Sequence, residues 1–379
     1  MRGPRGRPRR VPGLAVAVCL AAILAGQAAP AGARTGPGGR TGGSWVLTGS
    51  PVIGVDSYAA TLLPTGDVLV AGGGNPGDDA QLYDPRTGTW SLTGQMAYWR
   101  VDHTATLLQS GKVLVAGGGD QNGHPQNSAE VYDPVTGQWR STPPMHAARV
   151  GHAAVLLPDG RVLVMGGSTY LGYTASAEIY RPKKHQWIGT GSMAQGRADF
   201  QAILLPTGKV LVAGGTAAAQ PPLTSAELYD PVTGTWSPTG SMTEGRCCGT
   251  ATLLPDGRVL VAGGCCGGTP YTTASAELYD PATGTWTPTG SMADPREWAS
   301  AALLADGRVL VSGGYDSKFG TIWDTAELYD PTTGTWSATG AMNFPREHYA
   351  LIPLPNRYIL APGGSGGAST AELYIPPST

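Results

Sequence analysis

Residues 251–290 read ATLLPDGRVLVAGGCCGGTPYTTASAELYDPATGTWTPTG, and this stretch contains every element of the pattern that organises the chain. Two aliphatic runs flank a Pro-Asp-Gly turn at 255–257, and a Gly-Gly pair closes the second run. A short segment then ends in Tyr279, and Trp286 opens another segment beyond a second turn. Short apolar runs that alternate with turn residues predict four antiparallel strands, which we name a to d. Their predicted positions are the run that ends at Leu254, residues 258–263, residues 277–279 and the residues from Trp286 onward.

The same pattern occurs seven times, with a period of 45 to 50 residues. Every Trp precedes the next Gly-Gly pair by the same distance of 28 residues, as from Trp45 to Gly73, and each Tyr precedes its Trp by 7. Only the b–c loop, from the Gly-Gly pair to the Tyr, varies in length, from 10 to 15 residues, and it is longest in units 5 and 6. A four-stranded antiparallel unit repeated seven times predicts an all-β fold, a seven-bladed β-propeller. Loops that vary on a constant frame are where binding residues are expected.

The composition agrees with a turn-rich β fold and excludes several classes of protein. The 57 Gly and 32 Pro among 379 residues exclude a mainly helical chain, because both residues interrupt helix interiors. A net charge of -2 provides no basic field, so we expect no nucleic-acid partner. The sequence contains no phosphate-binding loop, paired-carboxylate constellation or Gly-x-Ser-x-Gly motif, so it carries no signature of an enzyme.

The Gly-Gly, Tyr and Trp signature resembles the kelch repeat over roughly residues 45 to 375. The resemblance implies a propeller related to that of galactose oxidase-like and glyoxal oxidase-like proteins, which are copper oxidases. Other kelch propellers, in the periplasm, act on sugars as mutarotases. The copper families need Tyr and His ligands and a Cys linked to a Tyr. Here the order is reversed as His348-Tyr349 and no lone Cys faces a Tyr, so we expect no cofactor and keep copper only as the alternative.

The two ends of the repeat predict how the ring closes. The first unit begins with a lone Trp strand, residues 45–48, and the last unit stops after Tyr374 without a Trp strand of its own. We therefore expect the N-terminal strand to supply strand d of blade 7, which removes an exposed sheet edge. The predicted propeller covers residues 45–376.

Residues 1–33 have the features of a secretory signal peptide. Five arginines precede an apolar run from Val11 to about Leu24, and Ala31-Gly32-Ala33 forms a cleavage pattern. Residues 34–44 are predicted to be a Gly-rich linker. We therefore expect a secreted protein of the extracellular space or cell envelope, monomeric and without stable membrane insertion after cleavage. The Arg-rich leader and the lack of Asn-x-Ser/Thr sequons favour a bacterial origin.

Six blades carry an Arg four residues after a Met and a Glu on strand c, whereas blade 1 has Val55 and Gln81 at these two positions. Because both are absent from the same blade, we expect each Arg to pair with the Glu of its own blade in a structural ion pair. The alternative is a cationic ring for an acidic ligand. The expected pairs are Arg100–Glu130, Arg149–Glu178, Arg197–Glu227, Arg246–Glu277, Arg296–Glu327 and Arg346–Glu372.

Four cysteines follow the signal peptide, namely Cys247, Cys248, Cys265 and Cys266. An even count in an exported chain predicts disulfides, and all four are expected to take part. The turn at 255–257 places Cys247 opposite Cys265, and a one-residue shift would place Cys248 there instead. A thiolate metal site is the rival interpretation, which vicinal cysteines disfavour, so we expect no metal.

Aromatic and histidine side chains gather at the b–c loops and at the d–a crossings, which lie on one face of a propeller. Exposed aromatic rings bind sugars by stacking and form hot spots for proteins. We therefore expect a non-enzymatic binding module for a protein or carbohydrate ligand, and the alternative is a copper oxidase or mutarotase. The predicted ligand-binding residues are Trp99, His103, His152, Tyr271, Trp298, Tyr315, Phe319, Trp323 and His348.

Overall fold

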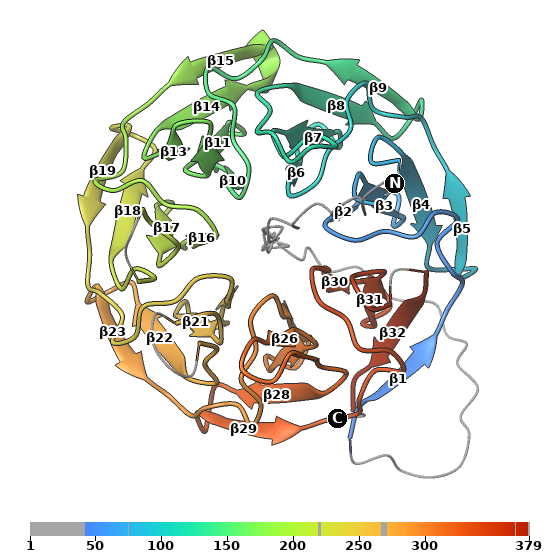
Figure 1. Cartoon of the computed structure of the whole chain (residues 1–379), viewed down its shortest axis with the longest axis vertical. Coiled ribbons are helices and arrows are strands. Elements are labelled where there is room, and N and C mark those ends of the chain that lie inside the picture. The colour runs from blue at the N-terminus through green and yellow to red at the C-terminus, as the bar shows by residue number, and fades with distance from the viewer. Residues whose placement is uncertain (1–41, 75, 219–220, 267–270, 368, 378–379) are drawn as a thin grey trace, which may run out of the picture.

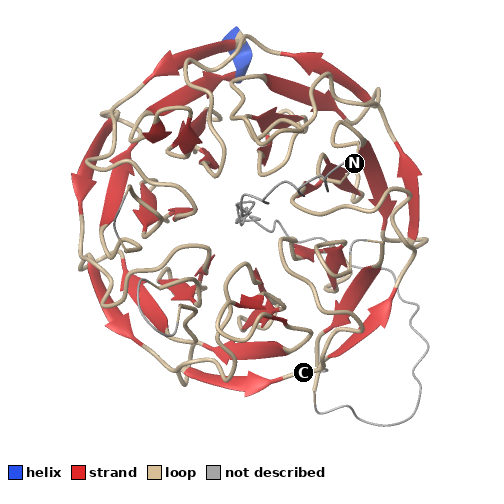
Figure 2. Ribbon diagram, in the orientation of Figure 1, coloured by secondary structure: helices blue, strands red, loops and turns tan. Residues whose placement is uncertain are grey.

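The computed structural model describes residues 42–74, 76–218, 221–266, 271–367 and 369–377. The chain forms a ring of seven four-stranded antiparallel sheets around a central axis (Figure 1), and Figure 2 shows that strands and loops make up nearly all of it. The predicted class, number of blades and number of strands per blade are all confirmed. The predicted signal peptide and residues 34–41 of the linker lie outside the described residues, and Ser44 belongs to the first strand rather than to the linker.

The blades follow one another in chain order, and the strands of each blade are arranged from the axis outward. Blade 1 contains β2 (Ala59–Leu62), β3 (Val68–Ala71), β4 (Ala80–Asp84) and β5 (Thr89–Leu92). Blade 2 contains β6 (Thr104–Leu107), β7 (Val113–Ala116), β8 (Ala129–Asp133) and β9 (Gln138–Ser141). Blade 3 contains β10 (Ala153–Leu156), β11 (Val162–Met165), β14 (Ala177–Arg181) and β15 (Gln186–Gly189). Blade 4 contains β16 (Gln201–Leu204), β17 (Val210–Ala213), β18 (Ala226–Asp230) and β19 (Thr235–Pro238).

The remaining blades have the same plan. Blade 5 contains β20 (Thr250–Leu253), β21 (Val259–Ala262), β22 (Ala276–Asp280) and β23 (Thr285–Pro288). Blade 6 contains β24 (Ser300–Leu303), β25 (Val309–Ser312), β28 (Ala326–Asp330) and β29 (Thr335–Ala338). Blade 7 contains β30 (Ile352–Pro353), β31 (Ile359–Pro362), β32 (Ala371–Ile375) and β1 (Ser44–Leu47). Two b–c loops form small hairpins, β12 (Ser168–Thr169) with β13 (Gly172–Tyr173) and β26 (Tyr315–Asp316) with β27 (Thr321–Ile322), and Pro182–Lys184 form a 3-10 turn.

The ring closes where the chain begins and ends. Strand β1 pairs antiparallel with β32, with Trp45 opposite Tyr374, so the N-terminal strand completes blade 7 as predicted (Figure 1). The Thr48 hydroxyl, just beyond β1, shares a hydrogen bond of 2.8 Å with the Tyr83 hydroxyl of blade 1. The closing strand therefore joins the two ends of the chain and also contacts the next blade.

The hydrophobic core lies between blades rather than within one sheet. Strand b is buried along its whole length, as in β17, because both of its faces are covered. Val210 and Val212 of blade 4 pack with Leu163 and Met165 of blade 3 in one cluster. Each interface thus joins residues about one repeat apart, which makes the ring mutually supporting.

The Gly-Gly pair is required by close approach of two chain segments. At Gly214 the backbone has φ +70°, and a Cβ there would lie 2.3 Å from the carbonyl oxygen of Arg246. Only glycine fits such a contact in a left-handed conformation. The pair therefore allows each b–c loop to pack against the d–a crossing of the next blade. Among the described residues, no helix has the length and hydropathy that a membrane span requires.

Candidate functional site

The d–a crossings and the b–c loops are joined on one face of the ring. In blade 6 the backbones of Glu297 and Tyr315 exchange two hydrogen bonds, of 3.0 and 2.7 Å. Equivalent bridges occur in five other blades, namely Val101–Gly119, Val150–Ser168, Ala198–Thr216, Cys247–Cys265 and Glu347–Ser365. The two sets of loops therefore form a single surface around the central axis of the ring, and we call the end of the axis on this face the channel mouth.

The six arginines of this face are not available to a ligand. Each is buried and forms an ion pair with the glutamate of its own blade, at 2.5 to 3.1 Å, as the sequence comparison predicts. Arg197, for example, also donates to the carbonyl oxygens of Gly214 and Ser225, at 2.9 and 3.0 Å. In blade 1 the amide of Gln81 replaces the pair and bonds the backbone of Val52 and Ile53. The arginines therefore tie the d–a crossing to the blade, and a cationic ring for an acidic ligand does not form.

Two residues after each arginine, one residue per blade adopts a left-handed conformation at the channel mouth. We call these seven positions the channel ring: Ser57, Asp102, Gly151, Asp199, Cys248, Trp298 and His348, with φ between 50° and 64°. Backbone hydrogen bonds link neighbours in the ring, as from Trp298 N–H to the Cys248 carbonyl at 2.8 Å and from Cys248 N–H to the Asp199 carbonyl at 3.0 Å. Another bond of the same kind, from Ser57 N–H to the His348 carbonyl at 3.3 Å, spans the closure between blades 7 and 1.

Glycine would suit every position of the channel ring, yet only blade 3 has one. A non-glycine residue in this region costs on the order of 1–3 kcal/mol, and bulky residues such as Trp298 are rare there. The other six blades hold a hydroxyl, two carboxyls, a thiol, an indole and an imidazole at this point. Strained positions that present diverse polar side chains at a channel mouth are typical of functional sites.

Five of the ring positions line a pocket at the channel mouth: Ser57, Asp102, Cys248, Trp298 and His348. The indole of Trp298 stacks on Tyr315 with ring centroids 6.0 Å apart and contacts the His348 ring at 4.5 Å. The Glu347 carboxylate approaches His348 Nδ1 at 3.6 Å. An aromatic surface thus meets several hydrogen-bonding groups in one place.

Burial keeps the acidic groups of this site protonated to unusually high pH. It raises the pKa of the Asp199 carboxyl well above its ordinary value, with a further contribution from Asp102. Burial likewise raises the pKa of Glu297 and of Glu347 to about 7, and at Glu297 the Glu347 charge adds to the effect. The Cys248 thiol also has a raised pKa, because it is buried beside Asp199. Near neutral pH, Glu297 and Glu347 are therefore only partly ionised.

The structure brings together Trp298, Tyr315 and His348, and His103 lines the same pocket although its ring is almost wholly buried. His152, in contrast, does not line this pocket. His103 and His152 are only 2% and 0% exposed. Their rings fill the space over Gly72 and Gly117, between neighbouring blades, which is the place that Phe200 and Tyr349 take elsewhere. Burial lowers the pKa of His103 to about 3. Both rings pack into a blade interface because each residue follows the channel ring by one position, and His103 also forms part of the pocket wall.

The other predicted residues are spread over the loops. Tyr271 and Phe319 are largely exposed on the b–c loops of blades 5 and 6. Trp323 instead donates from Nε1 to the Pro295 carbonyl at 2.9 Å and so ties its loop to a d–a crossing. Trp99, in the crossing that leads into blade 2, packs over Gly77 in the b–c loop of blade 1, several blades away from the Trp298 cluster. Of these four, Tyr271 and Phe319 thus form an exposed rim of the surface.

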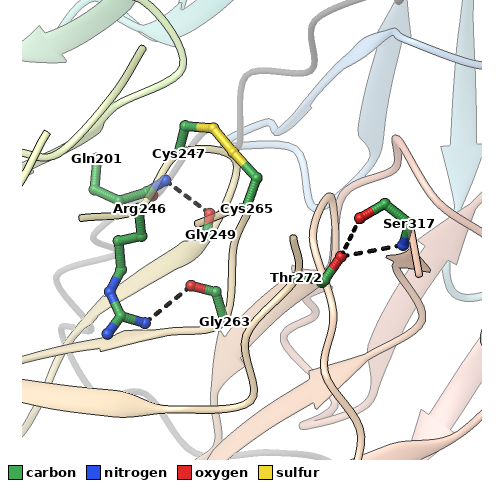
Figure 3. Close-up of a disulfide and its surroundings, with 8 residues drawn as sticks. All are labelled: Gln201, Arg246, Cys247, Gly249, Gly263, Cys265, Thr272 and Ser317. Atoms are coloured by element: carbon green, nitrogen blue, oxygen red, sulfur yellow. Dashed lines mark hydrogen bonds between the residues drawn. A yellow bond between two sulfur atoms is a disulfide. The ribbon is translucent and has the colours of Figure 1, made fainter. Parts of the chain in front are cut away.

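The cysteines form one bridge rather than two. Cys247 and Cys265 are disulfide-bonded (Figure 3), with Cα atoms 5.2 Å apart. They are a hydrogen-bonded antiparallel pair, in the register set by the turn at 255–257. The expectation that Cys248 and Cys266 also take part is wrong: Cys248 turns toward the channel at φ +55° and remains a buried thiol, and Cys266 N–H bonds the Tyr271 carbonyl in the loop.

Sequence reasoning missed Ser57, Asp102, Asp199 and Cys248 as neighbours of Trp298 and His348. The signal was present, because all of them stand two residues after the repeated arginine, or after Val55 in blade 1. Their variety disguised it, because Asp is the only residue type that occurs twice and the left-handed backbone is what the positions share.

Comparison with known proteins agrees with this architecture. The family model described as Kelch motif matches residues 103–146, 149–194, 205–243, 246–293 and 300–343, more than half of the chain. The chain therefore belongs to the kelch family. A solved structure of a fungal alcohol oxidase of the AA5 family, in complex with copper, is similar with a TM-score of 0.73 at 21% identity, covering 88% of this chain and 76% of the oxidase. At that identity the likeness shows the fold alone. No curated protein matches the chain.

The donor groups do not suit a copper centre of the histidine and tyrosine type. His103 and His152 are enclosed between blades, and His348 is the more accessible histidine of the pocket. Tyr349 is buried, bonds Ser312 at 2.7 Å, and has a pKa raised by burial, so its phenol keeps its proton. In the described part of the chain, three His, Cys, Asp or Glu donors converge only at Cys247, Cys248 and Cys265.

Proposed function

We propose that this kelch propeller is a binding module and that its ligand is a carbohydrate bound at the channel mouth. The observation that supports this most is the channel ring, which places Trp298 and a varied set of polar groups in one pocket at the cost of backbone strain. Sugars present apolar ring faces and many hydroxyls, so an aromatic surface beside hydrogen-bonding groups suits them.

The charge of the site supports a neutral ligand over an acidic one. All six arginines of this face are buried in ion pairs, and the carboxyls of the pocket would repel an anion once ionised. The exposed rings of Tyr271 and Phe319 stand on the adjoining loops and extend the surface for a longer chain of sugars. The disulfide is typical of an oxidising compartment and agrees with a secreted protein.

The test is a screen of neutral and acidic glycans, followed by calorimetry with the best glycan. We expect Trp298→Ala to weaken binding at least roughly tenfold, the effect of losing an aromatic anchor. Thr283→Ala lies in an exposed turn between strands c and d and serves as the control. Equal binding by wild type and Trp298→Ala would refute the site. If the protein captures a protein partner and binds no glycan, its ligand is a protein rather than a carbohydrate.

A sugar mutarotase is the second candidate, and one observation favours it. Glu297 and Glu347 have pKa values of about 7 and lie beside Trp298 and His348, which suits general acid–base work near neutral pH. Polarimetry of the sugar identified above, with wild type and Glu347→Gln, tests this activity. A copper oxidase would instead show stoichiometric copper in the purified protein and oxidise an alcohol.

A further inference from the structure

Three sulfur atoms meet beside the channel ring. The Sγ atoms of Cys247, Cys248 and Cys265 all lie within 4.8 Å of one another. Two of them are joined in the disulfide, and the third belongs to the buried thiol of Cys248, whose residue is 9% exposed. The proposed function uses Cys248 only as a wall of the pocket and leaves this convergence unexplained.

The three sulfurs are near enough to share one cation once the disulfide is reduced. With metal–sulfur bonds of about 2.3 Å in a tetrahedral site, the sulfurs lie roughly 3.8 Å apart. The bonded sulfurs of Cys247 and Cys265 would therefore have to separate to roughly that distance after reduction, with the Cys248 sulfur beside both. Cys247 and Cys265 are also held by two backbone hydrogen bonds, of 3.1 and 2.8 Å, so their positions do not depend on the disulfide alone.

We propose that reduction of the Cys247–Cys265 disulfide converts this cluster into a three-thiolate site for a soft divalent cation such as Zn²⁺ or Cd²⁺. A thiol reductant supplies the electrons: two RSH molecules become RSSR, and the disulfide becomes two thiols. Binding of the cation then forms three metal–sulfur bonds and releases three protons, one from each cysteine. The product, a divalent ion with three thiolates, has a net charge of −1.

The oxidised protein cannot offer this site. The thiolate is the metal ligand, and two of the three sulfurs have no proton to lose while they are bonded to each other. The site is therefore closed by oxidation and opened by a reductant.

Cd²⁺ is the probe, because its bonds to thiolates absorb in the ultraviolet. The full mature chain is reduced with a phosphine, desalted without oxygen and titrated, with a parallel titration of the oxidised protein. We expect one Cd²⁺ per reduced chain, with three protons released per ion in a weakly buffered solution. Oxidised protein should bind at least roughly tenfold more weakly.

Two variants locate the site. Cys248→Ser should weaken binding by the reduced protein at least roughly tenfold, whereas Cys266→Ser, outside the three-sulfur group, should not. In the unmutated protein, Cd²⁺ should protect Cys247, Cys248 and Cys265 from alkylation while Cys266 is still modified, which tests the site without any substitution. Equal binding by oxidised and reduced protein, or dependence on Cys266 instead of Cys248, would overturn the proposal.

Discussion

Replacing the Arg197–Glu227 pair by the residues that blade 1 uses tests how the d–a crossings are held. The guanidinium of Arg197 and the carboxylate of Glu227 meet at 2.9 Å and both are nearly inaccessible to solvent. In blade 1 the equivalent crossing is held by uncharged residues, with Val55 and Gln81 in place of Arg and Glu. Three variants follow from this comparison: Arg197→Val, Glu227→Gln, and the two together.

The single changes should be costly because each leaves one partner buried without its counter-charge. Removing one member of a buried pair typically costs about 3–5 kcal/mol. In the Arg197→Val protein the carbonyls of Gly214 and Ser225 also lose their donors. At about 2 °C per kcal/mol for a domain of this size, each single variant should melt roughly 6–10 °C lower. Replacing both members of such a pair is often close to neutral, so the double variant should recover much of the loss.

Differential scanning calorimetry of the four proteins completes a double-mutant cycle. We expect the double variant to be more stable than the sum of the two single losses by about 3 kcal/mol or more, at or above the upper end of the coupling seen between contacting residues. The control is the same cycle on Arg86 and Asp84, an exposed pair, which should show a coupling below about 1 kcal/mol. If the Arg197 and Glu227 losses are additive, the pair does not work as a unit and the arginines have another role.

Three further changes test other parts of the molecule. Deletion of residues 44–49 removes β1, exposes the edge of β32 and should lower the melting temperature of the whole ring; a shift of less than a degree or two would contradict closure by this strand. Glu297 and Glu347 bind protons more tightly in the folded state, with pKa values of about 7, so they make stability fall as pH rises from about 4.5 to about 7. Glu297→Gln should therefore raise the melting temperature more at pH 8 than at pH 5, and equal shifts at both would rule out the raised pKa. Trp323→Ala should destabilise because its bond to Pro295 is lost, whereas Phe319→Ala should not, and thermal melts of the two variants decide this.

Much of the fold can be read from the sequence because the determinants of each blade are local. The Pro-Asp-Gly and Gly-Gly turns, the aliphatic runs between them and the constant spacing from Trp to Gly-Gly specify four short strands per repeat. Counting complete and incomplete units was enough to predict that residues 45–48 complete blade 7. The joint absence of Arg and Glu from blade 1 identified the ion pairs, since a buried charge requires its partner.

The site depended on contacts that no single repeat contains. Asp199, Cys248 and Trp298 are about 50 residues apart in sequence, and they meet because ring closure links their backbones in a left-handed conformation around the axis. The sequence allowed either Cys247 or Cys248 to face Cys265. The hairpin register places Cys247 opposite Cys265, and the positive φ of Cys248 directs that residue toward the channel mouth. In the same way, the sequence predicted His103 and His152 to be surface ligands. Each follows the channel ring by one position, where the side chain points between two blades. The direction of a side chain there depends on how neighbouring blades pack, and the residue type does not reveal it.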